Sequence, residues 1–130
     1  MSMNKIVLDA SAMLAALNHE PGSEKLTPEM LSNSAGSTVN LAEVHTKLVS
    51  RGGDPDEAWE DTLSAIHEPV PFNEEQARIA GGLVTQTRAL GLSLGDRACL
   101  ALGLVLNAPV YTTDKSWKSL KLGVRIHVIR

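Results

Sequence analysis

The sequence predicts an α/β domain with a mainly parallel central sheet, and two observations carry this prediction. Short apolar runs such as Ile6-Val7-Leu8 alternate along the 130 residues with longer segments whose apolar positions recur at helical spacing. The run at 6–8 is apolar on both faces and suits a central strand covered on both sides. It ends at Asp9, and a helical pattern follows at once. This order places Asp9 at the carboxyl edge of the sheet, where open α/β folds bind ligands.

The other elements follow from the same patterns and from their end signals. Asp54 with Pro55 and, further on, Asn73 are expected to begin helices, and glycine or proline ends most of them. The helix that starts at Asp54 is expected to present a stripe of Trp59, Leu63 and Ile66. Helices are expected over residues 10–18, 23–31, 41–51, 54–66, 73–90 and 94–106. Strands are expected over 37–39, 69–72, 110–112 and 124–129, with a loop at 32–36. The prolines in 69–72 are expected at a strand start or a sheet edge.

Length and composition indicate one soluble globular domain over residues 1–130, with 43% hydrophobic and 21% charged residues. Cys99 is the single cysteine, so no internal disulfide is possible and a reducing cytoplasm is expected. No apolar run approaches the ~20 residues that span a bilayer, so no membrane association is expected. The net charge of −3 argues weakly against nucleic acid, but the residues after Asp114 include lysines and arginines and no acid.

Four acids lie where the predicted elements change, and each has an ordinary structural alternative. Asp9 ends the first strand, and Glu43 is expected in the first turn of the next long helix. Asp96 lies in the first turn of the helix at 94–106, and Asp114 follows a later strand. Asp9, Asp96 and Asp114 could equally cap helices, and Glu43 could be a solvated helix residue.

The common position of these acids favours chemistry over capping alone. Like charges at ~4–6 Å repel by roughly 3–4 kcal/mol per pair at an effective dielectric near 20, so a converging set needs protonation or a bound cation. Oxygen ligands select Mg²⁺ or Mn²⁺, and the four histidines are too scattered to compete. A carboxylate-held Mg²⁺ commonly serves phosphodiester hydrolysis, and no nucleotide-binding glycine motif offers another reading.

Four motifs together resemble the PIN-domain ribonucleases, specifically the VapC-type toxins of toxin–antitoxin pairs. They are VLDASAML at 7–14, NLAEVHTKL at 40–48, LSLGDRACLALG at 92–103 and VYTTDKSW at 110–117. The resemblance implies a three-layer α/β/α sandwich and a Mg²⁺- or Mn²⁺-dependent endoribonuclease that leaves 5′-phosphate and 3′-hydroxyl ends. It maps the catalytic set to Asp9, Glu43, Asp96 and Asp114.

The resemblance also implies roles within and around that set. Asp9, Asp96 and Asp114 would hold one or two metal ions, and Glu43 would be a further ligand or position the attacking water. Ser11 and Thr112 match hydroxyl positions that orient the acids or the water. Arg97 matches a common basic residue, or it packs against an acid. Residues that could contact RNA phosphates are Lys115, Lys118 and Lys121, with a solvated basic end as the alternative.

A partner and two rival functions complete the expectations. Toxins of this type are usually held by a cognate antitoxin helix and tend to form homodimers. The residues that could line the antitoxin groove, or could instead be plain core, are Met13, Leu14, Leu17, Leu41, Val44 and Leu48. One rival is a phosphoryl-accepting receiver domain, although the expected acid pair after the first strand is absent. The other is a catalytically silent PIN-like module that only binds a partner.

Overall fold

A computed structural model describes residues 4–130, which form five strands, seven α-helices and three short 3₁₀ helices. The strands are β1 (Ile6–Leu8), β2 (Ser34–Ser37), β3 (Glu68–Val70), β4 (Val110–Thr112) and β5 (Ile126–Val128). The helices are α1 (Ala10–Asn18), α2 (Pro28–Leu31), α3 (Thr38–Ser50), α4 (Pro55–Ser64), α5 (Glu74–Gly82), α6 (Val84–Thr87) and α7 (Leu94–Leu106). The 3₁₀ helices are η1 (Ser23–Lys25), η2 (Arg88–Leu90) and η3 (Lys115–Ser119). None of the helices in this part of the chain is both long and apolar enough to cross a bilayer.

The strands form one sheet in the order β3-β2-β1-β4-β5, and every pairing is parallel. The prediction of a mainly parallel sheet is therefore confirmed, with the proline-containing strand β3 at one edge as expected. All carboxyl ends meet at one edge of such a sheet, so Asp9 after β1 and Asp114 after β4 lie along the same edge. A receiver domain has the order 2-1-3-4-5, so this strand order excludes that rival.

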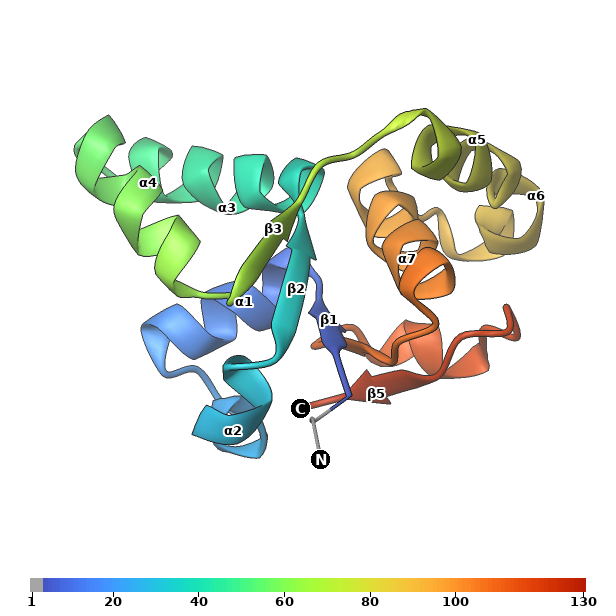
Figure 1. Ribbon diagram of the computed structural model, residues 1–130, viewed down its shortest axis with the longest axis horizontal. Coiled ribbons are helices and arrows are strands. Elements are labelled where there is room, and N and C mark those ends of the chain that lie inside the picture. Colours follow the sequence, from blue (N-terminus) through green and yellow to red (C-terminus); the bar gives the residue numbers. More distant parts are fainter. Residues whose placement is uncertain (1–3) are drawn as a thin grey trace.

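Helices cover both faces of the sheet and give the predicted three layers. Leu8 packs in a core cluster with Met13 and Leu41 from α1 and α3. Its neighbour Val7 packs in a second cluster with Cys99 of α7 and Trp117 of η3. Successive side chains of a strand point to opposite faces, so the two clusters lie on opposite sides of β1. Figure 1 shows α1, α3 and α4 on one side of the sheet and α5, α6 and α7 on the other.

Strand β2 corrects the predicted boundary between loop, strand and helix. The expected loop at 32–36 contains the strand, and Thr38 already belongs to α3 because the Ser37 side chain accepts a hydrogen bond from the Val39 backbone as its N-cap. The strand is built from small residues, all of them buried. A Cβ on Gly36 would lie 2.5 Å from Met13 Cε, so the packed helix leaves no room for larger side chains.

Two predicted helices are interrupted. The segment 23–31 is η1 followed by α2, because Thr27 is extended before Pro28 and caps α2 through the Met30 backbone amide. The segment 73–90 is divided into α5, α6 and η2. Its break follows the Gly81-Gly82 pair, which is unfavourable within a helix.

Burial also shows where two sets of apolar residues lie. The Trp59 side chain of the predicted stripe is 39% exposed and makes an edge-to-face contact with His45. Among the candidate groove residues, Leu17 and Leu48 are partly buried, whereas four belong to the buried core: Met13, Leu14, Leu41 and Val44. The structural alternative therefore holds for those four, and a partner cannot dock on them directly.

Candidate active site

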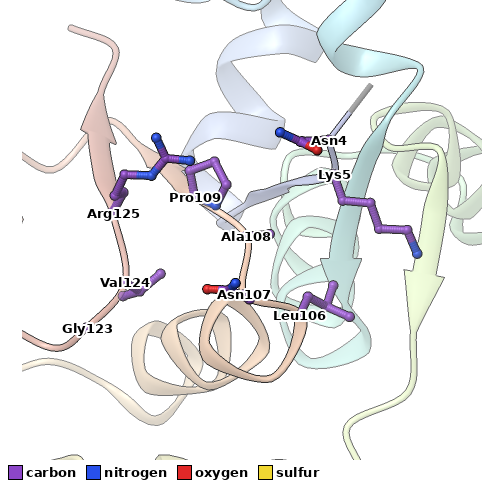
Figure 2. Close-up of a pocket in the computed structure, with 9 residues that line it drawn as sticks. All are labelled: Asn4, Lys5, Leu106, Asn107, Ala108, Pro109, Gly123, Val124 and Arg125. Atoms are coloured by element: carbon purple, nitrogen blue, oxygen red, sulfur yellow. The ribbon is translucent and has the colours of Figure 1, made fainter. Parts of the chain in front are cut away.

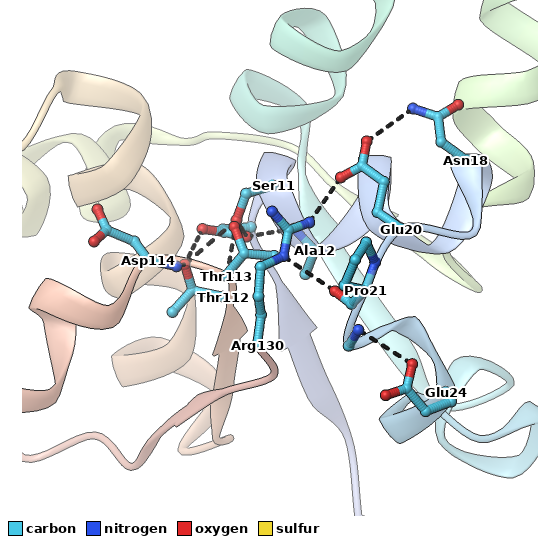
Figure 3. A network of polar contacts seen from close by, with 12 residues as sticks. Ser11, Ala12, Asn18, Glu20, Pro21, Glu24, Thr112, Thr113, Asp114 and Arg130 are labelled. Carbon is cyan, nitrogen blue, oxygen red and sulfur yellow. Dashed lines mark hydrogen bonds and ion pairs between the residues drawn. The ribbon is translucent and has the colours of Figure 1, made fainter.

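Asp9 is the centre of the candidate site because it ends β1, begins α1 and reaches across to β4. Its Oδ1 accepts hydrogen bonds from Ser11 Oγ at 2.7 Å and from the Ala12 backbone amide at 2.8 Å. Its Oδ2 accepts a hydrogen bond from Thr112 Oγ1 at 2.6 Å. Figure 3 shows this network between the start of α1 and the end of β4. Asp9 is thus a helix cap, and two hydroxyls also fix its carboxylate across neighbouring strands.

The Asp9 carboxyl is buried without a positive partner. It is 4% exposed, and no ion pair within residues 4–130 includes it. Burial raises its pKa from an ordinary 3.8 to about 6, and the negative charge of Asp96 adds to this effect. The hydrogen bonds from Thr112, Ser11 and Ala12 act in the opposite direction and do not offset burial. A buried carboxylate of this kind is stabilised by a cation or by a proton.

Glu43 and Asp96 are presented by the facing helices α3 and α7. Glu43 lies in the second turn of α3, not in the first as predicted, because α3 begins at Thr38. Its Oε1 accepts a hydrogen bond from Asn40 Nδ2 at 2.8 Å. Asp96 forms the capping box foreseen from the sequence: Ser93 Oγ accepts from the Asp96 backbone amide at 3.1 Å, and Asp96 Oδ2 accepts from the Ser93 backbone amide at 2.9 Å. The structural alternative for Asp96 is therefore present, and it leaves the other carboxylate oxygen without a hydrogen bond from residues 4–130.

Three of the four predicted acids act electrostatically on one buried thiol. Burial raises the pKa of Cys99, and the charges of Asp9, Asp96 and Glu43 raise it further. For two of these acids the contacts agree: the Glu43 carboxylate lies against Gly95, the residue before Asp96, and Asn40 Nδ2 donates to both Glu43 Oε1 and the Gly95 carbonyl.

Asp114 is joined to the group through its backbone and not through its carboxylate. Its backbone amide donates to Thr112 Oγ1 at 3.1 Å, one hydrogen bond away from Asp9. Its exposed carboxylate caps η3 by accepting from the Ser116 backbone amide at 2.9 Å and from Ser116 Oγ at 2.7 Å. Figure 3 shows this carboxylate turned away from Ser11. The cap that was the alternative for Asp114 is therefore formed.

The oxygen atoms of the candidate residues suit a hard divalent cation, but their side chains do not converge on one point in this structure. The candidate set offers only carboxylate and hydroxyl oxygens, which suit Mg²⁺ or Mn²⁺. Within residues 4–130, however, no three acidic, histidine or cysteine side chains are arranged to hold a metal ion. The reason is local, since Asp96 and Asp114 are turned toward the backbone amides that they cap. Rotation of these side chains toward Asp9 is needed for three of them to share an ion.

The remaining predicted residues divide into two groups. Ser11 and Thr112 both donate to Asp9, and Ser11 Oγ also accepts from the Thr113 backbone amide at 3.0 Å. Arg97 instead donates from Nη1 to the Ala80 carbonyl at 2.8 Å, so it ties α7 to α5 and pairs with no acid within residues 4–130. The predicted RNA contacts on and beside η3 are exposed: Lys115, Lys118 and Lys121. Asn40 is absent from the predicted site residues, although its spacing of three before Glu43 puts both on one helix face.

A pocket in the described part of the chain lies away from these acids. It has a volume of about 410 Å³ and lies at the opposite sheet edge, beside the residues that precede β1, β4 and β5. Figure 2 shows Arg125 and Pro109 on one side of it and Asn4 on the other. None of the predicted site residues lines it.

An all-parallel α/β/α sandwich with acids gathered at the carboxyl edge defines the class of this protein, and a family comparison identifies it. The model of the PIN domain matches residues 6–122, so the chain belongs to the PIN-domain family. A comparison with curated proteins gives no match.

Solved structures show that the fold is that of VapC toxins. VapBC2 from Rickettsia felis, solved on a promoter DNA fragment, matches with a TM-score of 0.73 and 21% identity over 96% of this chain and 98% of the other. DNA-bound VapBC from Salmonella typhimurium matches with a TM-score of 0.76 and 16% identity, over 98% of this chain and 100% of the other. VapC20 from Mycobacterium tuberculosis, a toxin that cleaves the sarcin–ricin loop, matches with a TM-score of 0.72 and 19% identity, over 93% of this chain and 99% of the other. At these identities the likeness concerns the fold.

Proposed function

We propose that this chain is a metal-dependent endoribonuclease and the toxin component of a type II toxin–antitoxin system. The observation that carries the proposal is the buried Asp9 carboxyl, whose pKa is raised to about 6 by burial and by the charge of Asp96, and which has no positive partner within residues 4–130. Membership of the PIN-domain family and the likeness to VapC structures support it.

In the proposed reaction Asp9, Asp96 and Asp114 would hold Mg²⁺ or Mn²⁺. When bound, such an ion lowers the pKa of water and neutralises the charge that develops on a phosphate. Thr112 and Ser11 keep the Asp9 carboxylate in place by donating to its two oxygens. Glu43 serves as a further ligand or orients the attacking water. Water adds to phosphorus and the P–O3′ bond breaks, which leaves a 5′-phosphate and a 3′-hydroxyl.

We assign the RNA backbone to the basic surface beside Asp114. Lys115, Lys118 and Lys121 are exposed and form no ion pair within residues 4–130. They follow β4 in the chain. The last residue of β4, Thr112, donates a hydrogen bond to the Asp9 carboxylate. Phosphates that contact these ammonium groups would lie along the same sheet edge as the acids, although the chain has a net charge of −3.

The proposal includes a cognate antitoxin, a homodimer and a cytoplasmic location. Several of the solved relatives are toxin–antitoxin complexes, among them one from Klebsiella pneumoniae. We expect the antitoxin to block the acidic edge and to contact the partly buried Leu17 and Leu48 at the surface of the core that α1 and α3 share.

The test is cleavage of structured RNA with Mg²⁺ or Mn²⁺ by the wild type and by Asp96→Asn. The N-cap Ser93 is unchanged, and the amide oxygen of asparagine can still accept from the Ser93 backbone amide, so this variant keeps the start of α7 and removes only the charge. We expect cleavage to fall by more than about 100-fold, the scale of losing one preorganised electrostatic contact. Asp54→Asn, which changes the exposed cap of α4, is the matched control and should cleave normally. Equal cleavage by wild type and Asp96→Asn would reject the assignment.

One observation favours a second candidate, a catalytically silent PIN-like binding module. The carboxylates of Asp96 and Asp114 are already used as caps, and no three-ligand arrangement exists within residues 4–130. A Mn²⁺ titration followed by thermal unfolding separates the two candidates. The nuclease should be stabilised by the ion, because a ligand that binds only the folded state raises its stability. The silent module should show no shift.

A further inference from the structure

Helices α3 and α7 meet at Asn40, whose side chain is only 1% exposed. Its Nδ2 donates to Glu43 Oε1 at 2.8 Å and to the Gly95 backbone carbonyl at 3.0 Å. Both partners are acceptors, so only the amide nitrogen can face them and the orientation of the side chain is fixed. One amide therefore ties the Glu43 carboxylate to the turn of α7 that carries Asp96.

The other end of the same amide accepts no hydrogen bond. Asn40 Oδ1 is buried and has no partner within residues 4–130. An unsatisfied buried acceptor costs free energy, and native folds retain few such groups without a reason. Rotating the amide by 180° would place this oxygen against Glu43 and Gly95, which are also acceptors. The contact to Glu43 is therefore kept at the expense of the amide oxygen.

Gly95 completes the contact from the α7 side. A Cβ at this position would lie 2.6 Å from Glu43 Cδ and would overlap the carboxylate oxygens. Gly95 does not have a positive φ, so its backbone conformation does not require glycine. A side chain at this helical position would therefore push the Glu43 carboxylate out of its place.

We infer that Asn40 and Gly95 are positioning residues for Glu43: Asn40 holds its carboxylate, and Gly95 leaves the space that the carboxylate occupies next to Asp96. This inference rests on the proposed function, in which Glu43 is a further metal ligand or orients the attacking water. Neither Asn40 nor Gly95 contacts the reacting atoms; both act through Glu43. Groups that orient a ligating carboxylate typically contribute 10- to 100-fold to metal affinity or activity.

Two quantities are measured: the Mn²⁺ dissociation constant by calorimetry on metal-stripped protein without RNA, and the single-turnover cleavage rate at saturating Mn²⁺. Glu43→Ala first establishes which of the two depends on Glu43. We expect Asn40→Ala and Gly95→Ala to impair that same quantity by about 10- to 100-fold. When Glu43→Ala is already present, adding Asn40→Ala or Gly95→Ala should change the same quantity by less than about twofold. Both residues act through the Glu43 carboxylate, which this background lacks.

Gly95→Ala separates positioning from structure, because alanine is the better helix former. Its unfolding free energy should equal or exceed that of the wild type while the Glu43-dependent quantity falls. Gly81→Ala in α5 is the matched control, since a Cβ there meets nothing within 4 Å. This control should gain stability and leave both measured quantities unchanged. If Asn40→Ala does not fold, Gly95→Ala and its double variant decide the question.

The outcomes distinguish this inference from the proposed function. If Glu43→Ala is impaired while Asn40→Ala and Gly95→Ala match the wild type, the positioning role is overturned and the nuclease stands. If Asn40→Ala or Gly95→Ala keeps its full effect in the Glu43→Ala background, the residue acts structurally and the inference is likewise overturned. If the wild type neither binds Mn²⁺ nor cleaves RNA, the proposed function fails and this inference fails with it.

Discussion

Replacing Asp9 by asparagine should stabilise the protein when no divalent cation is present. A carboxyl whose pKa rises from 3.8 to about 6 on folding destabilises the folded state by about 3 kcal/mol once it is ionised. Asparagine removes this cost and can still accept from Ser11 and Ala12, although a buried neutral amide has its own desolvation cost. The net gain near pH 7 should be about 1–2 kcal/mol, which raises Tm by roughly 3–8 °C for a domain of this size.

The pH dependence follows from the sign of the shift. Because the pKa of Asp9 is higher in the folded state, the folded protein binds this proton more tightly than the unfolded chain does. Relative to the ionised protein, the stability that protonated Asp9 contributes is fully present below pH 3.8 and is lost as pH rises through about 6. Urea unfolding in EDTA from pH 4 to pH 8 should show that the advantage of Asp9→Asn shrinks to less than about 1 kcal/mol near pH 4. Adding Mn²⁺ should stabilise the wild type more than the variant and reduce the difference at pH 7.

Asp54→Asn is the control because Asp54 caps α4 in the same way but is exposed. It should show no gain in either condition. If Asp9→Asn is no more stable than wild type at pH 7–8 in EDTA, or if its gain is the same at pH 4, the burial of an uncompensated charge is not what governs this site.

Three further perturbations test other parts of the fold. Gly36→Val should lower the unfolding free energy in urea by about 2–3 kcal/mol, because its Cβ would meet the Met13 methyl at 2.5 Å. Arg130→Gln removes the 2.8 Å ion pair with Glu20 and should cost at most about 1 kcal/mol, since both side chains are over one-third exposed. Arg130 lowers the pKa of Glu20, so in denaturation experiments this contribution should be present at neutral pH and vanish as pH falls through the lowered pKa. The buried Cys99 thiol, whose pKa is raised, should stay unmodified by a thiol reagent at pH 8 until urea unfolds the chain.

The order of elements could be predicted from the sequence wherever hydrophobic patterns and caps agree. Strand β1, helix α7 and the caps Asp54 and Asn73 are confirmed because each combines an apolar pattern with a residue that satisfies backbone amides. Strand β2 could not be found in this way. Its residues Ser34–Ser37 are small and weakly hydrophobic, and only the helices packed against it explain why the chain tolerates them in an interior strand.

The positions of the acids could be predicted, but the directions of their side chains could not. Parallel topology brings Asp9 and Asp114 to one sheet edge whatever their side chains do. Whether a carboxylate points to a shared centre or to its own helix depends on local amides, and Asp96 and Asp114 point to theirs. The role of Asn40 needed the tertiary contact with Gly95, which lies 55 residues further along the chain.

The double use of these aspartates as helix caps has a consequence for how tightly an ion could be held. Each carboxylate caps its helix with one oxygen, Asp96 through Oδ2 and Asp114 through Oδ1, so a cation could bind the other oxygen; where moving the side chain toward Asp9 breaks the cap, the loss costs about 1 kcal/mol. Two such losses weaken occupancy by roughly tenfold to thirtyfold relative to a cage of free carboxylates. Ions would therefore exchange readily with the surrounding solution, and turnover would follow the free concentration of the cation instead of depending on a permanently bound one.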